Sequence, residues 1–190
     1  WRVLFFVRHS FFLKCRFSSI LKNILSLRLS LKFNVLEVFM LERINYYAAA
    51  PDAMAILFKQ ESILSEQFSA IPTLSMTIWE LVKLRVSQIN QCAFCLDMHS
   101  TQALEMGETY ERMIALNAWQ DSSLFSDQER YALALAELLV AGHSVDDAKY
   151  EEMLAAFGEA GLTYLTIAIN AISSWNRVVK VFKPKVGSYR

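Results

Sequence analysis

Two cysteines and a histidine at short spacing are the residues in this chain best suited to chemistry. Cys92, Cys95 and His99 form a Cys-x-x-Cys-x-x-x-His pattern within a strongly helical stretch. Because each residue of an α-helix advances by about 100°, all three side chains fall within about 60° of one another around the axis. On one shared face, two thiols can close a disulfide and an imidazole can exchange a proton. The pattern therefore indicates a redox centre.

A metal half-site and plain core packing are the alternatives for this cluster. Zinc prefers four ligands, and the further candidates Cys15, His9 and His143 are isolated in the sequence. Buried cysteines commonly behave as small hydrophobic residues. A c-type haem requires a histidine directly after the second cysteine, and Leu96 stands there instead. We favour redox chemistry because the combined spacing is more specific than either alternative requires.

The geometry does not settle which sulfur attacks. His99 is separated from Cys95 by about 6 Å of helical rise and from Cys92 by about 10.5 Å. Helical side chains lean toward the N-terminus, so His99 leans onto Cys95, which favours Cys95 as the attacking sulfur and Cys92 as the resolving one. Cys92 lies nearer the first turn, however, where free N–H groups also stabilise a thiolate. Both orders remain open at this point.

Glu80 is a candidate partner for the histidine. If helices over 77–90 and 92–106 are antiparallel neighbours, Glu80 lies about 15 Å before the connecting turn and His99 about 12 Å after it. The two residues are then nearly level, so the carboxylate can accept a proton directly or through one water. The alternative is structural, since Thr77 and Glu80 also match a helix capping box.

The hydrophobic pattern from Met40 onward predicts an all-α fold, with the Cys-x-x-Cys motif at the start of a helix. The last helix is apolar on nearly every side, which indicates burial in a core or a subunit interface near Trp175 and therefore a homo-oligomer. Pro184 and Gly187 indicate a loose C-terminal tail. We expect helices over 52–69, 77–90, 92–106, 109–119, 126–142, 145–157 and 161–182.

Composition limits the classes of function. A chain of 190 residues with a formal net charge of zero fits one globular domain and does not indicate nucleic-acid binding. Three cysteines, two of them in one motif, fit a reducing compartment such as the cytoplasm.

The basic residues are distributed unevenly. Residues 1–39 contain seven Lys or Arg and one acid, Glu37, whereas 40–190 contain twelve basic and eighteen acidic residues. The basic residues recur too often for a transmembrane helix, so no membrane partner is expected. The segment is similar in composition to a transit peptide. We favour an upstream extension, poorly ordered or not native, before a single domain over 40–190.

The stretch from Glu80 to His99 is similar to the core motif of the alkylhydroperoxidase D-like proteins, which belong to the carboxymuconolactone decarboxylase superfamily. The resemblance covers nearly all of 40–190 and none of 1–39. It implies an all-α homo-oligomer that reduces hydroperoxides with thiols and without haem, metal or another bound cofactor. An external dithiol, of thioredoxin-like or lipoyl type, is the implied reductant. Further similar segments are Arg43–Tyr47, Gly107–Thr109, Asn117–Trp119, Phe125–Arg130 and Ser174–Arg177.

The resemblance also implies roles for the four site residues. The second cysteine of the family is the peroxidatic one, which corresponds to Cys95, and the first, Cys92, resolves it. The histidine and glutamate form a proton relay, which corresponds to His99 and Glu80. Phe94 is a departure, since some peroxidases of the family carry a second histidine there. The expected function is antioxidant reduction of organic hydroperoxides. The alternatives are a redox sensor or a zinc-stabilised module without enzymatic activity.

Overall fold

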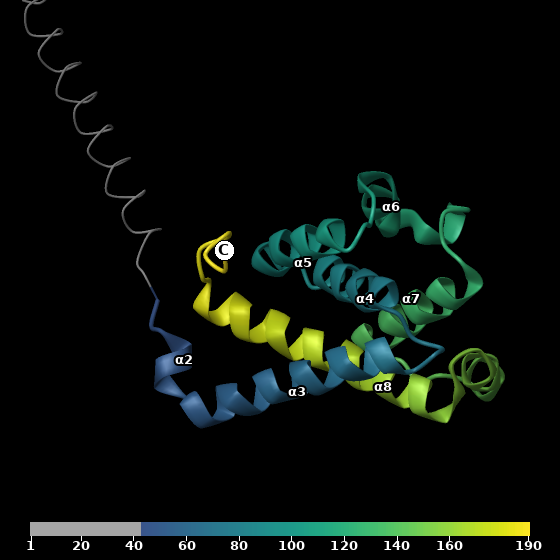
Figure 1. The fold of residues 1–190 in the computed structure, drawn as a ribbon, viewed down its shortest axis with the longest axis horizontal. Helices are drawn as coiled ribbons and strands as arrows, with labels where there is room; N and C mark the ends of the chain where they lie inside the picture. The colour runs from purple at the N-terminus through teal and green to yellow at the C-terminus, as the bar shows by residue number, and fades with distance from the viewer. Residues whose placement is uncertain (1–42) are drawn as a thin grey trace, which may run out of the picture. The chain divides into compact units, whose positions relative to one another are not determined.

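The computed structural model describes residues 43–190, and every regular element within this range is a helix (Figure 1). The expectation of an all-α fold is therefore confirmed. The proposed extension over 1–39 and the boundary at Met40 lie outside the described residues. The elements are α2 (Tyr46–Ala49), α3 (Pro51–Ala70), α4 (Met76–Ile89), α5 (Ala93–Glu105), α6 (Tyr110–Ala115), the 3-10 helix η1 (Leu116–Asp121), α7 (Asp127–Val140) and α8 (Asp147–Phe182).

Helix α4 is the central element of the fold. It packs against α3, α5, α7 and α8, and nine of its fourteen residues are buried. Its apolar residues recur at spacings of three and four, which places Ile78, Val82 and Val86 in the main core. Its other sides bury polar residues too, namely Glu80, Lys83 and Ser87. A helix enclosed by neighbours on most sides can hold charged groups away from bulk water, which is a requirement for tuning them.

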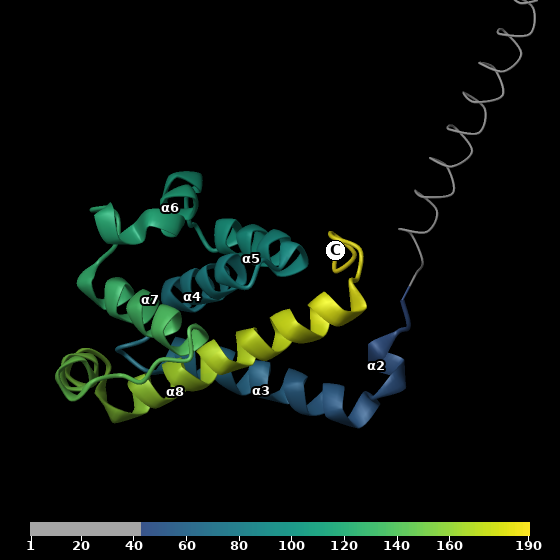
Figure 2. The same cartoon turned by 180° about the vertical axis from the view of Figure 1, so that it is seen from behind.

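The hairpin of α4 and α5 positions the cysteine motif. A short turn over Asn90 and Gln91 joins the two helices, which lie side by side in both views (Figures 1 and 2). Helix α5 begins at Ala93, and Cys92 is its N-cap residue with extended backbone angles. The helix ends before Gly107, whose φ of +92° fits the predicted stop. The antiparallel arrangement expected from the sequence is therefore present.

Helix α8 runs beneath this hairpin and beside α3 (Figure 1). The sequence predicts two helices here, over 145–157 and 161–182. The helical path is interrupted at Gly158, where φ is +68° and ψ is 171°, so the predicted helix end at this glycine is confirmed. By length and composition α8 is the single described helix apolar enough to span a membrane. Among its apolar residues, Leu165, Ile169 and Ile172 are buried in the core formed with α3, α4 and α7.

The predicted helix over 109–119 is shorter than expected. Helix α6 ends at Ala115, and the chain continues as η1 with a break at Ala118, where φ is −131° and ψ is 38°. The break leaves carbonyl groups without helical partners, and the guanidinium of Arg130 donates to those of Trp119, Gln120 and Ser122. Arg130 of α7 thus satisfies carbonyl groups that the interrupted helix leaves free. No local pattern in 109–119 indicates this interruption.

Candidate active site

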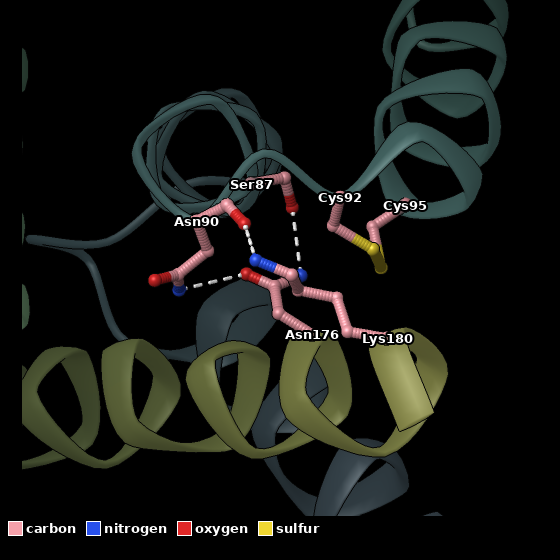
Figure 3. The surroundings of a disulfide bond; sticks show 6 residues. All are labelled: Ser87, Asn90, Cys92, Cys95, Asn176 and Lys180. Atoms are coloured by element: carbon pink, nitrogen blue, oxygen red, sulfur yellow. Dashed lines mark hydrogen bonds between the residues drawn. A yellow bond between two sulfur atoms is a disulfide. The ribbon is translucent and has the colours of Figure 1, made fainter. Parts of the chain in front are cut away.

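Cys92 and Cys95 are joined by a disulfide at the start of α5 (Figure 3). Their Cα atoms are 5.4 Å apart, within the range that a disulfide requires. Cys92 is the N-cap residue and Cys95 lies in the first turn. The N–H groups at a helix start stabilise negative charge, so the reduced pair occupies a position that favours a thiolate. The structure thus brings the two predicted sulfur atoms together.

His99 and Glu80 are in direct contact. The Nδ1 atom of His99 lies 3.0 Å from Oε2 of Glu80, and both residues are only 3% exposed. A carboxylate that accepts the Nδ1–H bond fixes the imidazole tautomer and leaves Nε2 to exchange a proton. His99 stands one turn after Cys95 on the same face of α5. The structure therefore places all four predicted residues in one region of the α4–α5 hairpin.

The alternative reading of Glu80 as a helix cap is wrong. Helix α4 begins at Met76, and its cap is Ser75, whose hydroxyl accepts a hydrogen bond from the Ile78 backbone at 3.1 Å. Glu80 then lies beyond the first turn and cannot reach the N-cap backbone. The Thr77 and Glu80 spacing matches a capping box only if the helix starts two residues later. The Glu80 carboxylate is consequently available for His99.

The disulfide is buried. Cys92 and Cys95 are each 1% exposed and form a small apolar cluster with Val179 of α8 and the ring of Phe94. A peroxide or a reductant therefore needs a local opening before it can reach either sulfur atom.

The C-terminal residues contribute to this cover, so the expectation of a loose tail is wrong. Tyr189 packs edge-on against Phe94, with ring centroids 5.6 Å apart, and its hydroxyl lies 2.8 Å from Oδ2 of Asp97. Arg190 also bonds Asp97, at 3.1 Å. The polar pair Asp97 and Thr101, one turn apart on α5, is a weak signal for such a contact.

Sequence reasoning missed Lys83. This lysine is 6% exposed, and its Nζ atom lies 2.9 Å from Oε2 of Glu61 and 3.7 Å from the centre of the Trp79 ring. Burial lowers the pKa of Lys83, against the opposing charges of Glu61 and Glu80. Because Glu80 and Arg85 lie on the same helix, no local pattern marks Lys83 as buried. Its charge also interacts with that of Glu80.

A cavity of about 320 Å³ with a mixed polar and apolar lining adjoins Glu80 at the N-terminal half of α4. Its other charged lining residues are Glu108, Arg112 and Glu129. Arg112 bonds Glu108 at 2.9 Å and Glu129 at 2.6 Å, so these three side chains form one ion cluster. In residues 43–190, with the two sulfur atoms bonded to each other, no group of three or more His, Cys, Asp or Glu is arranged to hold a metal ion.

Comparisons with known proteins agree with this geometry. The family model described as the carboxymuconolactone decarboxylase family matches residues 65–138, which include all four site residues. The uncharacterised protein YdfG of Bacillus subtilis (strain 168) is 38% identical over 141 residues, which are 73% of this chain and 92% of YdfG.

Two solved structures share the fold. ATU0492 from Agrobacterium tumefaciens, a protein of unknown function for which an AhpD-type antioxidant defence role has been suggested, has a TM-score of 0.69 and 30% identity, covering 76% of this chain and 97% of its own. The debrominase Bmp8 has a TM-score of 0.63 and 16% identity, covering 74% of each chain, which shows the fold alone. From the family match, the YdfG identity and the site, we conclude that this chain belongs to the carboxymuconolactone decarboxylase family, among its alkylhydroperoxidase D-like members.

Proposed function

We propose that this protein is a thiol-dependent peroxidase that reduces organic hydroperoxides and is reset by an external dithiol. The observation that carries the proposal is the placement of the Cys92–Cys95 disulfide beside the buried His99–Glu80 pair. A structural disulfide has no need of a buried imidazole with a fixed tautomer, whereas a cycling one requires proton transfer at each step. Membership of the family and the role suggested for ATU0492 support the same assignment.

The first step uses Cys95 and His99. Nε2 of His99 takes the thiol proton, and the Cys95 thiolate attacks the terminal oxygen of the hydroperoxide. The O–O bond breaks, Cys95 becomes a sulfenic acid, and the leaving alkoxide takes the proton from His99 to depart as an alcohol. Glu80 stabilises the imidazolium that exists between these two transfers, because it accepts the Nδ1–H bond.

Two further steps complete the cycle. The Cys92 thiol attacks the sulfenic sulfur of Cys95, which forms the disulfide and releases water. An external dithiol then reduces that disulfide by thiol–disulfide exchange and is itself oxidised to a disulfide. We propose a thioredoxin-like or lipoyl-type donor for this step, in a reducing compartment such as the cytoplasm where the pair can cycle. No bound cofactor takes part in the proposed cycle.

Redox sensing is the second candidate, and one observation favours it. Both cysteines are 1% exposed, and Tyr189 packs on Phe94, which lies between the two cysteines in sequence. A disulfide that opens only with a movement of the C-terminal residues can report oxidation to a partner through that movement. A sensor forms its disulfide once per oxidation event, whereas a peroxidase consumes peroxide continuously.

A turnover assay separates the candidates. Peroxide consumption is measured for several organic hydroperoxides with a panel of dithiols, in a Cys15→Ser background that leaves only the motif thiols. We expect many turnovers per chain, lost in Cys95→Ser, while Cys92→Ser stops after one. Stoichiometric oxidation without turnover in the unaltered motif favours the sensor. One zinc per chain by mass spectrometry favours the zinc-stabilised module.

We further propose a homo-oligomer. Ile56 and Phe58 of α3 are 71% and 50% exposed, and an apolar cavity of about 470 Å³ lies between α3 and α8. Trp175 of α8 packs against Phe58, with ring centroids 5.3 Å apart. Burial of this face by a second copy removes apolar surface from water. Light scattering should show an assembly that Ile56→Glu dissociates, and a monomer at micromolar concentration contradicts the proposal.

A further inference from the structure

The turn between α4 and α5 is held by side chains of α8 (Figure 3). Asn176 is completely buried. Its Nδ2 group donates to Oγ of Ser87 at 3.1 Å, and its Oδ1 accepts from Nδ2 of Asn90 at 3.0 Å. One turn further along α8, Nζ of Lys180 donates to the Asn90 carbonyl at 2.9 Å. These contacts join residues 86 to 90 positions apart in sequence, and none of them is used by the catalytic steps above.

The held segment leads directly into Cys92. Gln91 has a φ of +53°, a left-handed conformation that costs a residue with a side chain about 1 kcal/mol or more. The Cys92 N–H bonds the Ser87 carbonyl at 3.0 Å, so the side chain and the backbone of Ser87 connect Asn176 to Cys92. Cys92 then serves as the N-cap residue of α5. The backbone conformation that presents its sulfur thus depends on a strained turn, which α8 holds in place.

We propose that Asn176 and Lys180 are positioning residues that set how readily the Cys92 sulfur closes on Cys95. Closure is an intramolecular reaction in which the Cys92 thiolate attacks the oxidised sulfur of Cys95. The new S–S bond forms as the bond from Cys95 to its leaving group breaks, which releases water from a sulfenic acid or a thiol of dithiothreitol from a mixed disulfide. The equilibrium constant of closure depends on how often the two sulfurs are within bonding reach. A turn pinned from α8 keeps Cys92 in that position after reduction. The biological meaning of the proposal rests on the proposed peroxidase cycle, but its test does not.

The test measures the disulfide–dithiol equilibrium of the Cys92–Cys95 pair against dithiothreitol of known redox ratio, without peroxide, in the full chain with Cys15→Ser. Asn176→Ala removes two hydrogen bonds and Lys180→Met removes one while keeping the aliphatic stem. We expect the equilibrium to shift toward the dithiol by about tenfold in Asn176→Ala, which corresponds to ~30 mV, and by about threefold in Lys180→Met. Lys180→Arg retains a donor for the Asn90 carbonyl, so its disulfide–dithiol equilibrium constant should lie within about twofold of the parent value.

Ser173→Ala is the matched control. Ser173 is a buried polar residue one turn before Asn176, and its hydroxyl donates only within α8, to the Ile169 carbonyl at 2.9 Å. It should lower the melting temperature without moving the redox equilibrium. The proposal is overturned if Asn176→Ala and Lys180→Met keep the parent equilibrium, or if Ser173→Ala shifts it equally. If Asn176→Ala fails to fold, the exposed Lys180 still decides through its Met and Arg variants.

Failure of the peroxidase proposal has a different signature. A parent protein that shows no peroxide turnover, but whose disulfide equilibrium shifts in the Lys180→Met variant, retains the positioning inference and loses the proposed activity. Normal peroxide turnover together with an unchanged disulfide equilibrium in every variant retains the proposed activity and overturns the positioning inference.

Discussion

Glu80 and Glu129 line the same cavity, yet their surroundings differ. Glu129 accepts hydrogen bonds from the Arg112 guanidinium at 2.6 Å and from the Ser126 backbone at 2.8 Å. Burial would raise the pKa of Glu129, but the bonds from Arg112 and Ser126 outweigh burial and hold its pKa below the ordinary value. In the described part of the chain, Glu80 has one hydrogen-bond partner, His99.

The difference separates a structural carboxylate from one suited to proton transfer. A carboxylate bonded to a permanent cation stays ionised through the neutral range, because Arg cannot give up its proton. A carboxylate bonded to an imidazole has a partner that can both donate and accept a proton. From this contrast we propose that Glu129 contributes to stability and that Glu80 takes part in proton transfer, and the following predictions test that division.

The largest effect is expected at His99. His99→Gln keeps a side chain able to hydrogen bond Glu80 but removes the group that carries the proton. General acid–base catalysis contributes about 10²- to 10⁴-fold, so peroxide turnover should fall by that factor. The pH dependence of Cys95 alkylation in the reduced protein is the second measurement, and it should change while the melting temperature stays nearly constant. An unaltered alkylation profile removes His99 from the relay.

Glu80→Gln should have the next largest effect. The amide oxygen can still accept the Nδ1–H bond, but the negative charge that stabilises the imidazolium is lost, so turnover should fall by about 10- to 100-fold. Glu129→Gln is the matched control, since it makes the same chemical change in the same cavity. We expect it to retain turnover. Equal losses in both variants contradict the division between the two carboxylates.

Much of the arrangement of the hairpin could be predicted from the sequence. The 3.6-residue period places Cys92, Cys95 and His99 on one face, and the rise per residue places Glu80 level with His99 once the two helices are antiparallel. These deductions need only helix geometry and a short turn. The structure brings the four residues together, while their chemical roles stay predictions.

The remainder depends on contacts between distant segments. Lys83 resembles any solvent-exposed helical lysine until α3 covers it with Glu61. Asn176 meets Ser87 across 89 residues, and Tyr189 meets Asp97 across 92. No local pattern specifies which helix faces which turn, because that choice is made by packing of the whole core.

Glu129 should contribute to stability in a pH-dependent way. Glu129→Gln should lower the free energy of unfolding by about 1 to 2 kcal/mol at neutral pH, a modest value because the cavity admits solvent. A carboxylate with a lowered folded-state pKa stabilises the fold fully above its ordinary pKa of 4.5 and loses that contribution as the pH falls through the lowered value. Denaturant unfolding should therefore show a constant difference in the free energy of unfolding between the parent protein and Glu129→Gln from pH 6 to 8, in the working range. This difference should shrink in acid. A difference between the two proteins that grows in acid contradicts a stabilising role for ionised Glu129.

The smallest effect tests whether Glu80 is free of a capping role. The Ser75 hydroxyl accepts the Ile78 N–H bond, so Ser75→Ala should lower the free energy of unfolding by about 1 kcal/mol. Thr77 is exposed and lies inside the helix, so Thr77→Ala should change it by less than about 0.5 kcal/mol. Both values come from denaturant unfolding of the full chain. If Thr77→Ala costs as much as Ser75→Ala, the helix start is shared with the Thr77–Glu80 box, and part of any loss in Glu80→Gln belongs to capping. If only Ser75 matters, a loss of turnover in Glu80→Gln reports the relay, because no helix cap has been altered.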